Sequence, residues 1–330
     1  MKYLFLAAGL MSASIALPQT RQPQTTQPQT TQPQTTQPGK TPHTLLWRIS
    51  GKGITRPSYL FGTMHILCAG DANLSDSLRA AISSVDEVYF EINLSDVLGM
   101  AGALGAMQMK DGKTLSDLLK PDEYKRVKDY FAGHQSVLPL PFSFLERFKP
   151  MLISGFVEEE GMDCGPGGTD GMELQIMKVA KGQTPPKLID GLETAAFQAG
   201  LFDSIPYTKQ AKELVDYIDS ADYNKQQTRH LADLYNQQDL DGIQSVSDMD
   251  DPGMNEYMDL LLYGRNRKWA RILDTLLPVK SLLIAVGAAH LPGTQGVIEL
   301  LRKEGYTVEP VLSRTPKAGE SVAMSPGRRD

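Results

Sequence analysis

The sequence predicts an α/β protein, in the mixed α+β sense, with a single mixed β-sheet assembled from N-terminal and C-terminal segments and a large helical insertion in the middle. Strand-like apolar runs concentrate in residues 45–92 and 281–311, whereas residues 94–276 show mainly helical periodicity. The run at 281–286 is almost continuously apolar, which is typical of a strand buried on both faces. With 41% hydrophobic residues in a chain of 330, there is enough apolar material for such a core.

Both ends of the chain are expected to lie outside the folded unit. Residues 1–17 combine Lys2, a short apolar run and small residues spaced for cleavage, which predicts a secretory signal peptide. Residues 18–42 repeat Gln-Pro-Gln-Thr-Thr with few apolar side chains, so they predict a disordered tether. Residues 313–330 are predicted to form a disordered tail. The folded domain is therefore expected at 43–312, in a secreted or periplasmic protein.

The first third of the folded unit is predicted to combine strands with one helix. Residues 45–49 alternate apolar and polar side chains before a Gly-Lys-Gly turn, and residues 58–61 form a second apolar run. Residues 76–84 place apolar side chains on one helical face. Residues 88–92 then predict a buried strand whose apolar run is interrupted by Glu91.

The middle of the chain is predicted to be helical, apart from a short strand at 187–189. Pro121 suits the first position of a helix, because the missing N–H would have no helical partner there. Thr169 is expected to cap a helix that ends before Gly182. The remaining helices are predicted over residues 94–109, 145–159, 192–202, 208–219 and 224–235.

The last third returns to an α/β pattern. A long helix is predicted over 255–276, followed by the strand at 281–286. An amphipathic helix over 293–303 ends near Gly305, and residues 306–311 predict a final strand. The sheet would therefore be closed by segments that are distant in the sequence.

Two Gly-x-x-His motifs each follow a predicted strand. They span residues 62–65 and 287–290 and end in His65 and His290. Glycine permits a sharp turn because it lacks a Cβ atom and tolerates positive φ. Ligands of α/β sheets bind at the carboxyl ends of strands, so both imidazoles are expected at one sheet edge. The alternative is that they only cap strand ends with ordinary hydrogen bonds.

Three further residues are candidates for the same site. Glu91 is costly to bury unless it is paired or metal-bound, and two histidines with one carboxylate form a common transition-metal ligand set. Arg265 has the chemistry to hold a carboxylate or stabilise an oxyanion. Glu193 lies at a strand-to-helix turn. The alternatives are an edge-strand Glu91 that faces water, an Arg265 on a solvated basic helix face, and a Glu193 that only caps a helix.

Composition excludes some classes of function. The net charge of −6 argues against a nucleic-acid binder, and no apolar stretch reaches the ~18 residues of a membrane span. The sequence contains no Walker loop, dinucleotide fingerprint, Gly-x-Ser-x-Gly elbow or His-Glu-x-x-His helix. The two cysteines, Cys68 and Cys164, either pair in an oxidising compartment or remain thiols.

Taken together, these segments resemble the TraB/GumN family, which is grouped with the Tiki metalloproteases and the pheromone-shutdown proteins. The resemblance implies a fold related to erythromycin esterase and ChaN-like proteins. It also implies that the family's two histidines, glutamate and arginine fall on His65, His290, Glu91 and Arg265. The matching segments are residues 46–49, 59–65, 90–92, 191–194, 265–269 and 286–293.

For Tiki-like members the resemblance implies peptide-bond cleavage that depends on Mn or Co. We therefore expect a metal-dependent hydrolase of peptides or proteins, with Mn, Co or Zn held by His65, His290 and Glu91. Arg265 is expected to orient Glu91 or stabilise the oxyanion. If Glu91 is a metal ligand, Glu193 is the expected general base; otherwise Glu91 is the base itself. The alternatives are a metal-independent esterase-like hydrolase, a non-enzymatic iron or haem binder, and an envelope interaction protein with a degenerate site.

Overall fold

In the computed structural model, which describes residues 41–134, 140–162, 164–249 and 255–312, a six-stranded mixed sheet has the order β6-β4-β7-β2-β1-β8. The strand β7, from the last third of the chain, lies between β4 and β2 from the first third. This arrangement confirms the predicted sheet built from distant segments. The strands are β1 (Leu46–Ser50), β2 (Ser58–Thr63), β4 (Glu87–Ile92), β6 (Leu188–Glu193), β7 (Leu282–Gly287) and β8 (Thr307–Pro310).

Four neighbouring strands of this sheet run in the same direction. The strands β6, β4, β7 and β2 are parallel, with Phe90 opposite Ala285 and Gly62 opposite Val286. The strands β1 and β8 extend the sheet by antiparallel pairing. The central strand β7 is buried over its first five residues, as its unbroken apolar sequence requires. The carboxyl ends of the four parallel strands therefore meet at one edge.

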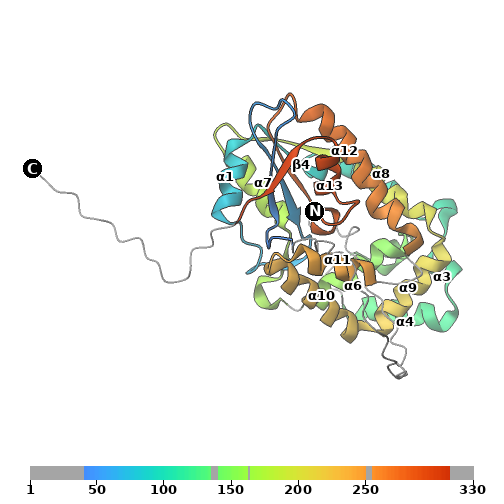
Figure 1. The fold of residues 1–330 in the computed structure, drawn as a ribbon. Helices are drawn as coiled ribbons and strands as arrows, with labels where there is room; N and C mark the ends of the chain where they lie inside the picture. The colour runs from blue at the N-terminus through green and yellow to red at the C-terminus, as the bar shows by residue number, and fades with distance from the viewer. Residues whose placement is uncertain (1–40, 135–139, 163, 250–254, 313–330) are drawn as a thin grey trace, which may run out of the picture.

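Helices cover both faces of the sheet. Figure 1 shows α1 (Asp76–Ser84) and α7 (Met172–Lys181) on one side, and α12 (Gly264–Leu276) and α13 (Val297–Lys303) on the other. The helix α1 has the predicted bounds because Ser75 caps it, its hydroxyl accepting a hydrogen bond from the Leu78 N–H at 3.2 Å.

The middle of the chain forms a largely helical group, most of it gathered beyond one end of the sheet (Figure 1). This group has its own apolar cluster around Phe148, Leu152 and Leu214. The Tyr235 hydroxyl of α10 donates a hydrogen bond to the Gly62 carbonyl at 2.9 Å, which ties the group to β2. Its helices are α2 (Val97–Met107), α3 (Leu115–Leu118), α4 (Pro121–Gly133), α5 (Phe142–Leu145), α6 (Pro150–Gly161), α8 (Ala195–Leu201), α9 (Tyr207–Asp219), α10 (Ala221–Asn236) and α11 (Leu240–Met249).

Several predicted helix boundaries were wrong. The helix predicted over 145–159 begins later, because Leu145 ends α5 and Pro150 begins α6. The predicted helix from Leu192 starts later, since Leu192 and Glu193 complete β6 and Thr194 is the cap of α8. The helix α11 was not predicted. The helix expected from residue 293 begins at Val297.

A second small sheet was also not predicted. Its strands are β3 (Leu67–Cys68) and β5 (Thr169–Asp170), which pair antiparallel with Leu67 opposite Asp170. Thr169 is therefore a strand residue, and Gly171 is the cap of α7. A disulfide between Cys68 and Cys164, which are 96 residues apart, holds the two segments together. The sequence left open whether the two cysteines pair or remain thiols, and the structure shows that they pair.

The predicted long helix over 255–276 contains a π-helical turn, Asp259–Tyr263, before α12. The Gly264 N–H donates its hydrogen bond to the Asp259 carbonyl. A Cβ atom at position 264 would lie 2.5 Å from that carbonyl oxygen, so the turn requires glycine. Such turns change the direction of the following side chains and are frequent at functional sites. Arg265, a predicted site residue, directly follows Gly264.

Among the described helices, none is both long and apolar enough to cross a bilayer.

Candidate active site

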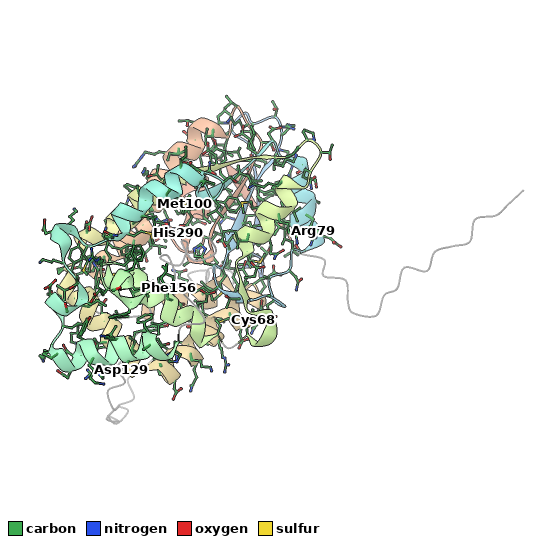
Figure 2. All side chains as sticks on the ribbon, turned by 180° about the vertical axis from the view of Figure 1, so that it is seen from behind. Cys68, Arg79, Met100, Asp129, Phe156 and His290 are labelled. Carbon is green, nitrogen blue, oxygen red and sulfur yellow. A yellow bond between two sulfur atoms is a disulfide. The ribbon has the colours of Figure 1, made fainter. Side chains whose placement is uncertain are left out.

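The sequence-predicted site residues come together at the carboxyl edge of the sheet. His65 follows β2, Glu91 lies in β4, His290 follows β7, and Glu193 ends β6. Arg265 reaches them from the first turn of α12. Figure 2 shows His290 near the middle of the molecule, whereas Asp129, on the helical group, lies at its outer edge. Four neighbouring parallel strands thus supply four of the five predicted residues.

The two motif glycines are required by close packing. A Cβ atom at Gly62 would lie 3.1 Å from the Cα atom of Ala288, and one at Gly287 would lie 3.2 Å from the Glu91 carboxylate. Neither residue belongs to the glycines with positive φ, and Gly287 has φ −50°. Tolerance of positive φ is therefore not what these two positions require. The missing side chains instead let the second motif approach both β2 and Glu91.

Arg265 joins the two buried carboxylates. Its Nη2 donates to the Glu91 Oε2 at 2.5 Å, and its Nε donates to the Glu193 Oε1 at 2.8 Å. Its Nη1 donates to the Leu261 carbonyl at 3.0 Å, in the π-helical turn. Only 5% of the residue is exposed, which excludes the alternative of a solvated helix face. Arg265 orients Glu91 and neutralises much of the local negative charge.

Glu91 is buried and ionised. Its Oε1 accepts a hydrogen bond from the Gly287 N–H at 2.8 Å, and its Oε2 accepts another from Gln198 at 3.0 Å. Burial raises the pKa of Glu91, but its electrostatic interactions, first with Arg265 and then with His290 and His65, hold that pKa well below its usual range. The alternative of an edge-strand glutamate in water is therefore excluded.

Glu193 lies behind Arg265. Besides the bond from Arg265, its Oε2 accepts a hydrogen bond from the Trp269 indole at 3.3 Å. Its side chain is 0% exposed. Burial raises the pKa of Glu193, and the Arg265 guanidinium opposes this shift. These contacts suit a residue that supports Arg265 better than one that receives a proton from substrate.

His290 lies in the 3-10 turn Ala288–His290 and is 4% exposed. Its Nδ1 lies 2.5 Å from the Asn266 Oδ1, and its Nε2 lies 3.7 Å from the Glu91 Oε1 and 3.4 Å from the Arg265 Nη1. Burial lowers its pKa to about 3, although Glu91 opposes the shift. The imidazole is therefore neutral at physiological pH.

His65 has a different environment. Its Nδ1 lies 2.6 Å from the Glu173 Oε1, and 17% of its side chain is exposed. Burial lowers the pKa of His65, but the charge and hydrogen bond of Glu173, and then the charge of Glu91, raise it to about 9. Glu158 of α6 also interacts electrostatically with His65, and burial raises the pKa of Glu158 to about 7.

The sequence interpretation missed Glu173 and Asn266, although each carried a signal. Glu173 lies on the buried face of α7 with Ile176 and Ala180, and Asn266 lies on the buried face of α12 beside Trp269. A polar residue on an apolar helical stripe is costly to bury without a partner. That position indicates a partner supplied by another element.

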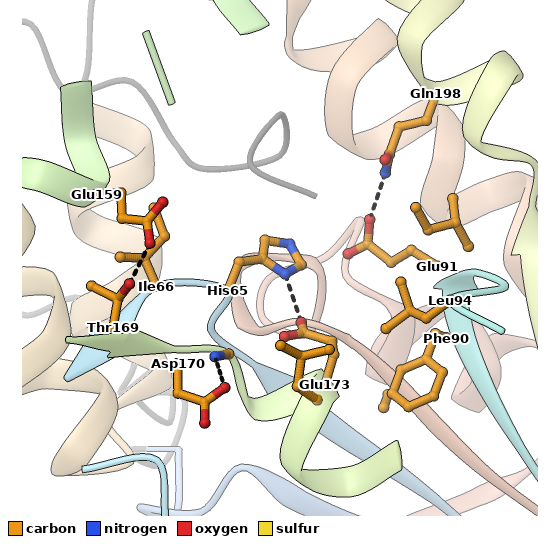
Figure 3. Close-up of a pocket in the computed structure, with 14 residues that line it drawn as sticks. His65, Ile66, Phe90, Glu91, Leu94, Glu159, Thr169, Asp170, Glu173 and Gln198 are labelled. Atoms are coloured by element: carbon orange, nitrogen blue, oxygen red, sulfur yellow. Dashed lines mark hydrogen bonds and ion pairs between the residues drawn. The ribbon is translucent and has the colours of Figure 1, made fainter. Parts of the chain in front are cut away.

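A pocket opens beside His65 and Glu91, which both line it (Figure 3). Its remaining walls are mainly apolar and include Ile66, Phe90 and Leu94. The close-up shows His65 directed toward Glu173, and Glu91 held by Gln198 across the pocket. The carboxylates Glu159 and Asp170 also border this space. Of the five predicted site residues, the pocket is lined by His65 and Glu91.

The side chains of His65, His290 and Glu91 are chemically suitable ligands for a divalent transition metal. Two imidazoles and one carboxylate are ligands that Zn, Mn and Co accept, and the Nδ1 atom of each imidazole is already held by another side chain. Within the described part of the chain, however, no three His, Cys, Asp or Glu side chains lie at the spacing of a complete metal site. The His290 Nε2 and Glu91 Oε1 atoms lie 3.7 Å apart.

The fold and this site define an α/β protein with a buried histidine–carboxylate–arginine centre at the carboxyl edge of its sheet. A profile of the TraB/PrgY/gumN family matches residues 45–310, so the chain belongs to this family. The match includes every residue of the centre described above.

The chain is also similar to animal metalloproteases. It is 23% identical to "Metalloprotease TIKI2" of Danio rerio, over 84% of this chain and 62% of that protein. It is 25% identical to "Metalloprotease TIKI1" of Danio rerio, over 87% of this chain and 66% of that protein. A "Metalloprotease TIKI homolog" of Amphimedon queenslandica is 24% identical, over 81% of this chain and 61% of that protein. The chain therefore spans less than two thirds of the length of these relatives. No solved structure matches it.

Proposed function

We propose that this protein is a metal-dependent peptidase that cleaves peptide or protein substrates. The observation that carries the proposal is the meeting of both motif histidines with Glu91 at one sheet edge, beside an open pocket. The similarity to proteins named metalloproteases supports the same chemistry. A pocket lined mainly by apolar side chains with a few polar groups is a common form of substrate site.

His290, Glu91 and His65 would hold the metal, with Mn, Co or Zn as the candidates. A bound divalent ion would supply an activated water at neutral pH by lowering its pKa. The buried, neutral His290 keeps an uncharged nitrogen beside Glu91. The ionised Glu91 contributes the negative charge that a cation requires.

Arg265 orients Glu91 in this proposal. Because one Glu91 oxygen is bound by Arg265 and Gln198, its other oxygen is directed toward His290 and the Gly287 N–H. We therefore assign Glu91 as a ligand rather than as the base. Glu193 supports Arg265, since its oxygens accept hydrogen bonds from Arg265 and Trp269 and it does not itself line the pocket.

The test is hydrolysis of a peptide library by the wild type, His65→Ala and His290→Ala, with Mn, Co, Zn or a chelator. We expect both substitutions to reduce metal-dependent cleavage by more than about 100-fold, since even partners of metal ligands cost 10–100-fold. His43→Ala is the matched control, because His43 is exposed and its Nδ1 lies 3.1 Å from the Gln237 carbonyl, outside the candidate site.

Other outcomes would identify a different function. Cleavage that is insensitive to the chelator would indicate a metal-independent, esterase-like hydrolase. A haem absorption band without hydrolysis would indicate a non-enzymatic iron or haem binder. Equal activity of the wild type and both histidine variants would contradict the proposal.

We also propose that the protein is secreted or periplasmic. The predicted signal peptide and the predicted tether up to residue 40 lie outside the described residues. The disulfide between Cys68 and Cys164 supports export, because disulfides persist in oxidising compartments. Fractionation of cells that express the full chain, compared with one lacking residues 1–17, tests this. Retention of the full chain in the cytosol would contradict it.

A further inference from the structure

The orientation of the Asn266 amide is determined by its neighbours. Its Nδ2 lies 2.9 Å from the Gln295 carbonyl and 3.4 Å from the His290 carbonyl, and its side chain is fully buried. Carbonyl oxygens only accept hydrogen bonds, so the amide nitrogen must be on this side. The amide oxygen therefore faces the His290 ring.

This orientation determines which ring nitrogen of His290 carries the proton. The Asn266 Oδ1 can only accept, and it lies 2.5 Å from the His290 Nδ1. The Nδ1 atom must therefore be the protonated one, because an unprotonated nitrogen would oppose another lone pair. The lone pair of a neutral ring is then on Nε2, which lies 3.4 Å from the Arg265 Nη1 donor and 3.7 Å from the Glu91 Oε1.

Asn266 also anchors the segment that carries the second motif. Its bond to the Gln295 carbonyl joins α12 to the turn after His290. Arg267, on the next position of α12, donates to the Gln295 side chain at 3.0 Å. The ring of His290 packs on Trp269 of the same helix, with ring centroids 4.5 Å apart. One helix thus restrains both the place and the rotation of the imidazole.

We propose that Asn266 is a positioning residue that selects the Nδ1-protonated tautomer of His290 and so presents the Nε2 lone pair to the site. His65 has the corresponding contact, since its Nδ1 is held by Glu173. The role of Nε2 as a metal ligand rests on the proposed function. The choice of tautomer does not, because it follows from the hydrogen bonds of the protein alone.

The experiment compares Asn266→Asp with Asn266→Leu in full-length protein. Both variants lose the donor to the Gln295 carbonyl, but only aspartate keeps an acceptor for His290. Long-range ¹H–¹⁵N correlation spectra of metal-free protein, labelled in histidine, report which ring nitrogen carries the proton. We expect the Nδ1-protonated form in the wild type and Asn266→Asp, and its loss in Asn266→Leu.

Zinc titration by calorimetry is the second measurement. Asn266→Leu is expected to weaken zinc binding by about 10–100-fold, and Asn266→Asp to restore most of it. An Nε2-protonated His290 in the wild type would overturn the inference, even if neither variant folds. Equal effects of both substitutions on tautomer and affinity would also overturn it. A wild type with the expected tautomer and no affinity for zinc would contradict the proposed function alone.

Discussion

The two Gly-x-x-His motifs follow neighbouring parallel strands, yet their imidazoles lie in different environments. His65 borders the pocket, pairs with the carboxylate of Glu173, and has a raised pKa. His290 is buried, pairs with the amide of Asn266, and has a lowered pKa. The same short pattern therefore delivers one imidazole that favours a proton and one that excludes it.

The difference arises from the elements that surround each motif. The first motif is bordered by α7 and by the small sheet that the Cys68–Cys164 disulfide secures. The second lies against α12, whose Arg265 adds a positive charge. A carboxylate partner stabilises an imidazolium ion, whereas burial beside a guanidinium destabilises it. A histidine motif thus fixes the position of the ring but not its charge.

The largest expected effect comes from removing the charge beside the second motif. Arg265→Met would leave Glu91 and Glu193 buried without their shared cation. We expect the free energy of unfolding, measured by urea denaturation, to fall by about 3–5 kcal/mol. Arg267→Met is the control, because its ion pair with Asp259 is solvent-exposed and is worth about 1 kcal/mol or less. Similar losses in both variants would show that the buried ion pairs of Arg265 stabilise the fold no more than the exposed ion pair of Arg267.

The corresponding constraint near the first motif is the disulfide. Replacement of Cys68 and Cys164 by serine opens a loop of 96 residues. We expect the free energy of unfolding to fall by about 2–4 kcal/mol, because the unfolded chain gains conformational freedom. Thermal and urea unfolding with and without a reductant measure the change. A double variant as stable as the wild type would show that the small sheet does not need the bond.

The pH dependence of stability should separate the two imidazoles in metal-free protein. Folding raises the pKa of His65 to about 9, so its stabilising contribution is complete below pH 6.5 and is lost as the pH rises through 9. The full loss is roughly 3 kcal/mol. Folding lowers the pKa of His290 to about 3, so its contribution is present above pH 6.5 and is lost as the pH falls toward 3.

Urea denaturation across this pH range, with a chelator present, tests both contributions. His65→Gln should flatten the alkaline side of the stability profile, and His290→Gln should flatten the acidic side. The carboxylates that interact with His65 also titrate: Glu173 and Glu91 on the acidic side, and Glu158 near pH 7. The variants are therefore compared with the wild type at each pH. Profiles that change on the same side in both variants would contradict the assigned difference.

The smallest expected effects come from the motif glycines. Gly62→Ala would bring a methyl group against the Ala288 backbone, which costs about 1–3 kcal/mol. Gly287→Ala should have an effect of the same order, since the added methyl group would lie 3.2 Å from the Glu91 carboxylate, which Arg265 and Gln198 hold in place. Gly200→Ala on α8 is the control, because no atom lies within 4 Å of the added group and alanine favours the helix by up to about 1 kcal/mol. Thermal unfolding ranks the three, and a neutral Gly62→Ala would exclude close packing as the reason for that glycine.

Much of the sheet was predictable because burial leaves a local record in the sequence. The run at 281–286 and the interrupted run at 88–92 indicated buried strands, and both lie in the sheet. The helix over 76–84 was predictable for the same reason, since its cap and its apolar face lie in one segment. By contrast, Thr169 resembled a helix cap, and its pairing with Cys68 could not be seen from neighbouring residues.

The site was predictable in part for the same reason. His65, His290 and Glu91 stood out because each follows or interrupts an apolar run. Arg265 was indicated by the family resemblance rather than by its spacing, because its basic neighbours suggested a solvated face. Glu173 and Asn266 were missed, since their function depends on a partner more than 20 residues away. Whether these residues carry the proposed catalysis stays a prediction.

The sequence by itself determined which segments form the buried strands and that both imidazoles emerge at the strand ends. Hydrophobic periodicity and glycine act locally, so they can be read along the chain. Only the tertiary structure decided that Arg265 joins Glu91 to Glu193, that Cys68 bonds to Cys164, and that the two histidines differ in charge. These properties depend on hydrogen bonds and electrostatic fields between segments that meet only after folding.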